Sequence, residues 1–418
     1  MSEESNTKKA VVVGGGIVGI CCALYLQKQG FNVTVIDPAE AGESTAKWSC
    51  GQMAVSEIIP LSKKGILKKI PGWLIDQQGP LALRPSAFPG IIPWFLQFLA
   101  CSRDARIEEI ASSLASLTHH VYEDYEILLE DCADKSLLGT RPILELFDSP
   151  DDIEHEKKYL ELRQRFGFKH QILDEKDISD LEPVFAGKFK HGLLFNDWTA
   201  VKDTKGFIAA LTESFIAKGG KRISSEVVEL RENGNKVNQI LLSNNLLIDT
   251  DYVVMAAGVG SKLFSKQLGI NPPLEGIAGY QVVLPNSGVE IKHSTIYASG
   301  GFCFAPMTRG LQIGGTIEFA AAGAKPNMKR AEIILNKATK IIPELNTDGI
   351  EYGVGYRPFL PDTKPIIDIS PRLPNVALAF GHGQLGLTLG ATTGRLVAEI
   401  LTQKTPKIDL TPFKATRF

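Results

Sequence analysis

The chain has 418 residues, of which 44% are hydrophobic and 22% charged, as in an ordinary soluble protein with about two or three domain-sized cores. Its formal net charge of −2, without a basic tail, argues against a nucleic-acid partner. The first residues, MSEESNTKK, lack the apolar core of a secretion signal. No apolar run approaches the roughly 20 residues that span a bilayer. The six cysteines form no CxxC pair and no zinc-binding spacing. We therefore expect a cytoplasmic protein without a metal site, whose cysteines are reduced and mostly pack.

Residues 9–37 contain the strongest motif. An apolar run ending at Val13 meets three consecutive glycines, a helical apolar pattern follows, and a second apolar run ends in Asp37. This order of strand, glycine turn, helix, strand and acid is typical of a dinucleotide-binding unit. A bare GxGxxG is a weak signal, but the flanking elements at the expected distances make the prediction specific.

Each part of this motif has a physical task. Gly14 allows a tight turn, Gly16 lets a pyrophosphate approach the backbone, and Gly19 lets the helix lie close to the sheet. The helix start, with Ile17 and Val18, offers free N–H groups and a positive dipole end to phosphates. Asp37 is expected to accept hydrogen bonds from a ribose diol.

The polar loop 42–53 follows the ribose-binding strand. It is either a simple linker or the place where a long cofactor continues. The candidate cofactor contacts in it are Ser44, Thr45, Ser49, Gly51 and Gln52.

Two apolar segments come next. In residues 61–74, four lysines alternate with apolar residues, and residues 88–101 are strongly apolar and broken by two prolines. Both segments are equally consistent with buried packing and with a basic, aromatic patch on a membrane surface.

The rest of the chain alternates between helical and extended patterns. We expect a long amphipathic helix at 103–133, a polar irregular stretch at 140–160, and a helix at 203–218 that ends at two glycines. Strands are expected near 226–231, 236–242, 246–249 and 250–258, then across 278–317, followed by a helix at 329–342. The tail predicts three strands, a glycine-rich turn at 381–386 and a last helix to Leu401.

Glycine features at 14–19, 258–260 and 381–386 favour FAD over a nicotinamide, because an extended flavin cofactor needs contacts spread along the chain. In the last turn, Gly381, Gly383 and Gly386 precede a helix whose N-terminus would stabilise the negative charge of a reduced flavin. The alternative is a glycine-rich loop that serves packing alone.

The glycine fingerprint, ESTAKWSCGQM, TDYVVMAAG, GYRPFLPDTKPIID and FGHGQLGLTLGATTGRLVAEIL occur in the order seen in the FAD-dependent D-amino-acid oxidase and glycine oxidase superfamily. The chain resembles this superfamily over essentially its whole length, and is most similar to the small subunits of bacterial D-amino-acid dehydrogenases. The resemblance implies an α/β fold with a discontinuous Rossmann-like FAD-binding domain, at 1–85, 168–275 and 351–418. It also implies a substrate domain with a mainly antiparallel sheet, at 86–167 and 276–350.

The resemblance also implies site residues. Arg357 in GYRP matches the family's substrate arginine, and a guanidinium holds a carboxylate in a planar fork. Tyr280 is a candidate pocket residue, although three other tyrosines compete with it, and His382 is either a contact to flavin or substrate or part of a packed turn. Trp48 is a candidate substrate contact. The remaining predicted cofactor contacts are Val227, Ala257, Gly258, Leu385 and Leu387.

The implied reaction is transfer of hydride from the α-carbon of a D-amino acid to flavin N5, followed by hydrolysis of the imine to a 2-oxo acid and ammonia. The electrons are expected to pass to a quinone or respiratory-chain acceptor, with the protein on the inner membrane surface or bound to a partner subunit. Family members with covalent flavin use a histidine after the second strand or a cysteine near the tail strand, and neither is found here, so the FAD is expected to be non-covalent.

Two alternatives stay open at this point. One is an oxidase or dehydrogenase of a secondary amino acid, of hydroxy-D-proline, sarcosine or glycine type. The other is a non-catalytic subunit that carries FAD for a larger complex. The loop 47–52 departs from the dehydrogenase pattern, with Lys47 and Trp48 in place of small residues, which leaves the substrate preference open.

Overall fold

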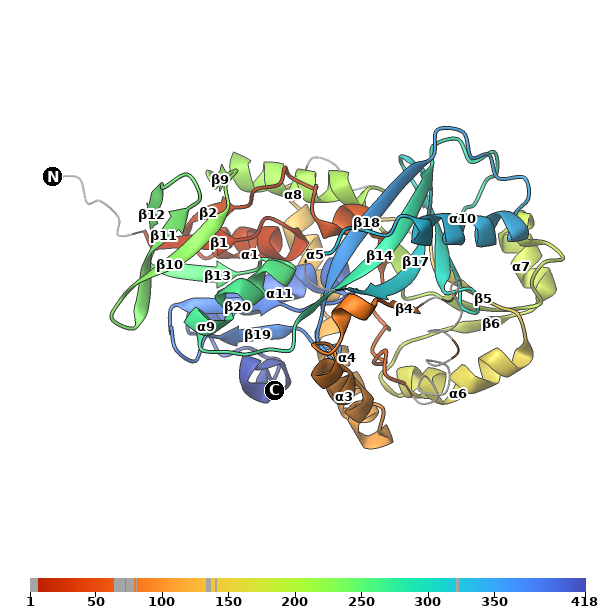
Figure 1. Cartoon of the computed structure of the whole chain (residues 1–418), viewed down its shortest axis with the longest axis horizontal. Coiled ribbons are helices and arrows are strands. Elements are labelled where there is room, and N and C mark those ends of the chain that lie inside the picture. Colours follow the sequence, from red (N-terminus) through yellow and green to blue (C-terminus); the bar gives the residue numbers. More distant parts are fainter. Residues whose placement is uncertain are drawn as a thin grey trace.

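The computed structural model describes residues 7–63, 72, 79, 81–132, 137–139, 141–320 and 323–418. Figure 1 shows two sheets side by side along the long axis, a six-stranded sheet near the N-terminus of the chain and a nine-stranded sheet at the other end. The strands of the first sheet come from widely separated parts of the sequence, so the chain crosses between the two sheets several times.

The six-stranded sheet confirms the predicted dinucleotide-type unit. β1 (Lys9–Val13), α1 (Ile17–Lys28) and β2 (Asn32–Ile36) follow one another, and β1 and β2 pair in parallel. The sheet order is β19-β20-β13-β1-β2-β9, and all neighbours are parallel except β19 and β20. The other strands are β9 (Lys221–Ile223), β13 (Tyr252–Met255), β19 (Ile366–Ile369) and β20 (Val376–Phe380).

Alternate residues of the six-stranded sheet enter two hydrophobic cores. Val12 and Val254 belong to a core beneath the helices, whereas Val11 and Val253 belong to a core on the other side. The helices of the first core include α1, α4 (Asp104–Thr118), α5 (Val121–Leu129), α8 (Thr204–Ala217) and α11 (Gly386–Leu401). On the other side lie β10 (Val227–Asn233), β11 (Lys236–Leu242), β12 (Leu247–Asp249) and α9 (Ser265–Leu268).

The nine-stranded sheet is mainly antiparallel, as the resemblance implies. Its order is β18-β14-β17-β16-β15-β5-β7-β6, with β4 paired in parallel to β17. The strands are β4 (Leu81–Leu83), β5 (Ile143–Phe147), β6 (Gln171–Leu173), β7 (His191–Phe195), β14 (Glu275–Leu284), β15 (Thr295–Tyr297), β16 (Phe302–Met307), β17 (Gly310–Phe319) and β18 (Glu351–Phe359). Helices α7 (Glu175–Leu181) and α10 (Lys329–Ile341) pack on its outer face around a separate core. A short pair, β3 (Gln52–Met53) and β8 (Thr199–Ala200), lies apart from both sheets.

The structure differs from the sequence prediction at two places. The expected helix 103–133 is two helices, α4 and α5, which separate at His119 and His120. The stretch 140–160, expected to be irregular, forms β5 and the start of α6 (Pro150–Arg165), whose N-cap Ser149 accepts from the Asp152 amide.

Several strands and helices also pack with a different sheet from the one that the predicted domain segments imply. β4, β6, β7 and β18 pair within the nine-stranded sheet, although their residues lie in ranges assigned to the FAD-binding domain. Conversely, α4 and α5 pack in the core of the six-stranded sheet, although they lie in a range assigned to the substrate domain. The exact domain boundaries stay a prediction.

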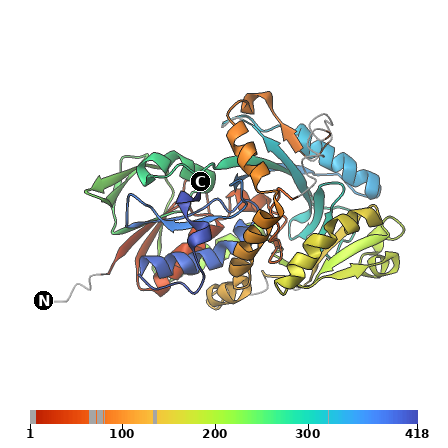
Figure 2. The same cartoon turned by 90° about the horizontal axis from the view of Figure 1, so that it is seen from below.

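The segment 88–101 contains α3 (Ile92–Ala100), which projects from the body of the molecule in Figures 1 and 2. Trp94 and Phe98 are buried, and their rings stack at 5.2 Å between centroids, so this face of the helix packs inside. Leu96 is 63% exposed on the other face. Most of the lysine-containing segment 61–74 lies outside the described residues. None of the described helices combines the length and apolar character that crossing a membrane requires.

Candidate functional site

A cavity of about 930 Å³ lies between the two sheets. Its walls come from the carboxyl ends of β1, β2, β13 and β20 and from the inner face of β14, β16, β17 and β18. Ligand sites are preferentially found at such sheet edges and at domain interfaces. The predicted site residues that line it are Gly14, Gly16, Ile17, Val18, Asp37, Ser44, Thr45, Trp48, Ser49, Gln52, Val227, Ala257, Gly258, Arg357, Gly381, His382, Gly383, Leu385, Gly386 and Leu387.

Three predicted site residues do not line the cavity: Gly19, Gly51 and Tyr280. Gly19 is required by packing, because a Cβ there would lie 1.9 Å from the carbonyl oxygen of Gly14. Gly51 has a φ of +73°, and its Cβ would lie 2.1 Å from the carbonyl oxygen of Val201. Both glycines are therefore required by close packing behind the wall of the cavity.

The glycine turn at the start of α1 is open to the cavity. Gly14 has a φ of +105° and its amide donates to the Ile36 carbonyl at 2.9 Å, which brings the turn close to β2. The N-cap residue Gly16 offers no side-chain cap, and no acidic residue stands in the first turn of α1. The N-terminus of this helix therefore presents its amides and positive dipole end to the cavity.

Asp37 has a structural task that the sequence did not reveal. Its Oδ2 accepts from the Gly15 amide at 2.6 Å and its Oδ1 from the Ala39 amide at 2.8 Å. The carboxylate thus joins the end of β2 to the glycine turn. It also lines the cavity, and each oxygen has a second lone pair that remains suitable for a ribose hydroxyl.

A second helix begins at the same cavity. α11 starts at Gly386 with no side-chain cap and no acidic residue in its first turn. It packs closely against α1, since a Cβ at Gly394 would lie 2.7 Å from the carbonyl group of Cys21. Two helix N-termini from opposite ends of the sequence are thereby aimed into one cavity.

His382 is held by α11. Its Nε2 lies 2.9 Å from Oγ1 of Thr393, and the side chain is buried. Burial lowers the pKa of His382 to about 3, so the imidazole is neutral at physiological pH. The arrangement favours a packing role for His382 in the turn 381–386 over a direct contact to flavin or substrate.

The loop after β2 forms one wall. Its 3-10 turn Thr45–Trp48 is tied to β18, where Thr45 Oγ1 donates to the Tyr356 carbonyl at 3.2 Å. Ser44 lies beside Gly16, and its Oγ is buried without a hydrogen-bond partner in the described structure. A buried unpaired hydroxyl in a cavity is costly unless a ligand satisfies it.

These features fit an FAD. The two uncapped helix N-termini and the orphan Ser44 hydroxyl match the anionic diphosphate and the ring edge of such a cofactor. Glycines at 14, 16, 381, 383 and 386 leave the backbone accessible where a long cofactor would pass. Among the described residues no cluster of side chains is suited to hold a metal ion.

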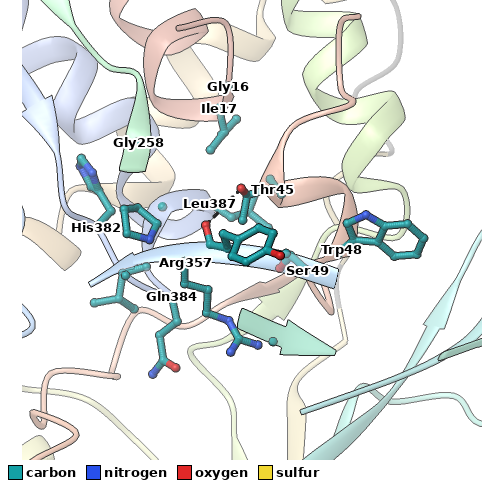
Figure 3. Close-up of a pocket in the computed structure, with 18 of the residues that line it drawn as sticks. Gly16, Ile17, Thr45, Trp48, Ser49, Gly258, Arg357, His382, Gln384 and Leu387 are labelled. Carbon is teal, nitrogen blue, oxygen red and sulfur yellow. Dashed lines mark hydrogen bonds between the residues drawn. The ribbon is translucent and has the colours of Figure 1, made fainter. Parts of the chain in front are cut away.

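Arg357 lies at the other side of the cavity. Figure 3 shows its side chain extending from β18 away from Gly16 and Ile17. Its Nη1 donates to the Thr316 carbonyl at 3.3 Å, and no carboxylate of the described residues lies within ion-pairing distance. Burial lowers the pKa of Arg357, while the thiols of Cys50 and Cys303 partly oppose that shift. A guanidinium without a counter-carboxylate in a cavity is suited to bind an anionic ligand.

The floor under Arg357 is made of glycine. A Cβ at Gly279 would lie 2.4 Å from Cζ of Arg357, so the guanidinium rests directly on the backbone of β14. Gly314 and Gly315 continue this flat surface on β17.

The prediction that Tyr280 faces the pocket is wrong. Its hydroxyl donates to Oε2 of Glu318 at 2.5 Å and accepts from the Asn327 amide at 2.8 Å, on the outer face of the sheet. Successive residues of a strand point to opposite faces, so Gly279 and Gln281 face the cavity and Tyr280 cannot. The alternating pattern of this strand in the sequence indicates the outer face for Tyr280, because Ala278, Tyr280, Val282 and Leu284 all enter the outer core.

Trp48 lines the cavity, but its indole packs against residues outside the part of the cavity near Arg357. The Arg309 guanidinium lies 4.6 Å from the ring centroid, and a Cβ at Gly353 would lie 2.2 Å from the ring. In Figure 3 the indole points away from Arg357. The ring therefore packs across β18, and the loop backbone forms the nearer wall.

Sequence reasoning missed several residues of the substrate side. Gln281, Cys50 and Cys303 line the cavity, and Gln384 lies in the turn before α11. The expectation that the cysteines mostly pack holds for Cys21, Cys22, Cys101 and Cys132, which are buried, and fails for the two in the cavity. Gln281 and Cys303 are adjacent only because both strands pair with β17 at Gly314, which no local pattern indicates.

Comparison with known proteins agrees with this geometry. A family model described as FAD dependent oxidoreductase matches residues 9–400. The chain is 31% identical to a D-amino-acid oxidase of Bradyrhizobium diazoefficiens over 98% of this chain and 99% of that protein. It is 29% identical to a D-amino acid dehydrogenase of Paramagnetospirillum magneticum, again over 98% and 99%.

Solved structures share the fold. The glycine oxidase of Geobacillus kaustophilus superposes with a TM-score of 0.74 at 18% identity, covering 99% of this chain and 100% of that one. The L-proline dehydrogenase of P. horikoshii gives 0.72 at 19% identity, covering 99% and 98%. The chain belongs to the DAO family and is an FAD-dependent oxidoreductase of the D-amino-acid oxidase and dehydrogenase type.

Proposed function

We propose that this protein oxidatively deaminates D-amino acids to 2-oxo acids and ammonia. The observation that supports this most directly is Arg357, a guanidinium that faces the cavity without a carboxylate partner among the described residues. The names of its relatives point to the same substrate class. A bidentate arginine fixes both the charge and the orientation of an amino-acid carboxylate.

The bound FAD would supply the hydride acceptor. The residues of this chain would then do three things. Arg357, resting on Gly279, would bind the substrate carboxylate at one side of the cavity. The helix N-termini of α1 and α11 would hold the negative charges of the cofactor. The neutral His382 would keep the glycine turn in place through Thr393.

The decisive experiment is anaerobic mixing of the purified yellow protein with a panel of amino acids. We expect bleaching of the flavin band by D-amino acids and not by their L-enantiomers. Bleaching by sarcosine, glycine or hydroxy-D-proline alone would assign a secondary-amine or glycine substrate. No bleaching by any of them, with FAD bound, would assign a non-catalytic FAD-carrying subunit.

We also propose that the FAD is non-covalent and that Asp37, Ser44 and the two helix N-termini hold it. The flavin should then be released intact when the protein is denatured. Yellow colour that stays with the precipitated polypeptide would contradict this.

Finally, we propose a quinone or respiratory-chain acceptor and peripheral attachment to the cytoplasmic face of the inner membrane. Support comes from exposed apolar side chains on α3 and just before it, Phe88, Ile92 and Leu96, which are 51%, 43% and 63% exposed. Co-sedimentation with anionic vesicles at low and high salt tests the attachment, since the electrostatic part falls with salt. A protein that stays in the supernatant, and reduces oxygen as fast as quinone, would be a soluble oxidase.

A further inference from the structure

We propose that Cys50 and Cys303 form a redox-active dithiol in the substrate side of the cavity, which a hydroperoxide closes to a disulfide and a thiol reductant reopens. The two residues are separated by 253 positions in the sequence and meet only in the fold. Neither the family membership nor the proposed deamination requires such a pair, whereas its inferred effect on carboxylate binding rests on the proposed role of Arg357.

The geometry brings the two sulfur atoms into direct contact. Cys303 Sγ lies 2.8 Å from Cys50 Sγ and 3.3 Å from the Gly314 carbonyl oxygen, and its single S–H donates to one of them at a time. Cys50 comes from the loop before β3 and Cys303 from β16, and both are partly exposed and line the cavity. A small peroxide entering the cavity therefore reaches both sulfurs.

Gly314 makes this contact possible. A Cβ at that position would lie 2.9 Å from Cys50 Sγ and 1.6 Å from Oε1 of Gln281. This glycine on β17 leaves the space into which the Cys50 side chain extends. The pair is thus built into the floor of the cavity, beside the glycines that support Arg357.

The two thiols have unequal environments. The hydrogen bond from Cys303, together with the charges of Arg357 and Arg309 and a contact from Gln312, holds the pKa of Cys50 below its ordinary value despite burial. The same hydrogen bond and burial raise the pKa of Cys303 well above its ordinary value. A thiolate is the nucleophile in thiol oxidation, so Cys50 is the attacking sulfur and Cys303 the resolving one.

The reaction balances with one hydroperoxide. The Cys50 thiolate attacks the terminal peroxide oxygen, forms an S–O bond and releases hydroxide or alkoxide, which leaves Cys50 as a sulfenic acid. The Cys303 thiol then attacks this sulfur, and the S–O bond breaks with loss of water. The dithiol has lost two electrons and the peroxide has gained them. Two equivalents of an external thiol reverse the change by thiol–disulfide exchange.

Closure changes the charge beside Arg357. In the dithiol form, ionisation of Cys50 places an anion near the guanidinium, and this anion repels a substrate carboxylate. In the disulfide form this anion is gone. We therefore infer that oxidation tightens the binding of carboxylate ligands, so that the site responds to the redox state of its surroundings.

The test uses the FAD-loaded protein. After treatment with one to a few equivalents of hydrogen peroxide, thiol alkylation and peptide mass spectrometry should find a Cys50–Cys303 cross-link that dithiothreitol reverses. Cys21, Cys22, Cys101 and Cys132 are internal controls, because they are buried and burial raises the pKa of each. Oxidation of Cys50 to sulfinate without a cross-link, or equal oxidation of all six thiols, would overturn the proposal.

Variants separate the two roles. In Cys303→Ser the Cys50 sulfenic acid should persist and react with dimedone, whereas Cys50→Ser should give no dimedone adduct at Cys303. Cys101→Ser is the matched control and should still form the cross-link, and FAD content reports whether each variant folds. Swapped dimedone labelling would reverse the assignment of attacker and resolver.

The effect on binding is measured by calorimetry with benzoate, a carboxylate that lacks an amine to oxidise. The dissociation constant should fall at least about threefold on oxidation and recover with dithiothreitol. Cys50→Ser should show no dependence on peroxide. An unchanged constant in the wild type, with the disulfide formed, would overturn the inferred effect on the substrate site.

Discussion

The guanidinium of Arg357 on β18 lies directly on Gly279 of β14, so closely that a Cβ at position 279 would come within 2.4 Å of Cζ. The two residues are brought together by the antiparallel pairing of these strands, in which Ile277 is the register partner of Arg357. The position of the guanidinium that we propose to bind the substrate carboxylate thus depends on the absence of a side chain on the neighbouring strand.

Gly279→Ala should displace the guanidinium. Because the group that must move is the end of a flexible side chain, we expect the free energy of unfolding and the FAD content to change little. KM for amino acids should rise by about tenfold, which corresponds to roughly 1.4 kcal/mol. Steady-state kinetics checks this, with Gly276→Ala on the same strand as control, where the new Cβ would meet Val259 at 3.1 Å. Equal effects of the two variants would contradict the relationship.

Arg357→Lys should weaken substrate capture and leave FAD bound. Lysine keeps the charge but loses the planar fork, and disruption of a buried carboxylate pair costs about 2–5 kcal/mol, so KM should rise by well over tenfold. Arg372→Lys is the matched control, because Arg372 pairs with Glu232 on the surface. Unchanged kinetics with Arg357→Lys would remove this residue from the site.

Asp37→Ala should lower FAD occupancy after purification without added FAD. It removes the acceptor for the Gly15 and Ala39 amides and for a ribose hydroxyl, each hydrogen bond contributing about 1 kcal/mol. Asp37→Asn keeps one acceptor oxygen and should give an intermediate occupancy, measured as the ratio of flavin to protein absorbance. Full occupancy in the alanine variant would show that the carboxylate is dispensable.

Tyr280→Phe should destabilise the protein without changing substrate binding. It leaves the Asn327 amide and the buried Glu318 carboxylate without the tyrosine hydroxyl, at a cost of about 1–3 kcal/mol. Chemical denaturation measures the loss, and KM should stay within about twofold of the wild type. A large rise in KM with unchanged stability would return Tyr280 to the site.

Glu145 gives a pH dependence with a definite sign. Burial raises the pKa of Glu145 from 4.5 to about 7. Between these values the unfolded chain ionises while the folded chain keeps its proton, so the stability contributed by this residue is lost as pH rises from about 4.5 to 7. Glu145→Gln cannot ionise and should be more stable than the wild type at pH 8 by about 1–3 kcal/mol, and equal to it near pH 4.5. A difference that does not vary with pH would exclude this cause.

Local patterns were sufficient for the elements that are continuous in sequence. The unit 9–36 was predictable because its strand, glycine turn and helix are fixed by neighbouring residues. The last helix and the glycine turn before it were predictable from the same kind of local pattern. Most cofactor-side residues lie at such strand ends, which explains why their sequence positions sufficed to place them at the cavity.

Tertiary structure decided the substrate side. Which face of β14 meets the cavity follows from its pairing with β17 and β18, and this pairing turns Gln281 inward and Tyr280 outward. Cys50 and Cys303 meet because a loop 253 residues away lies over β16 and Gly314 has no side chain. Local sequence determines periodicity and turns, whereas contacts between distant strands depend on register and on the space left by other segments, which only the folded chain defines.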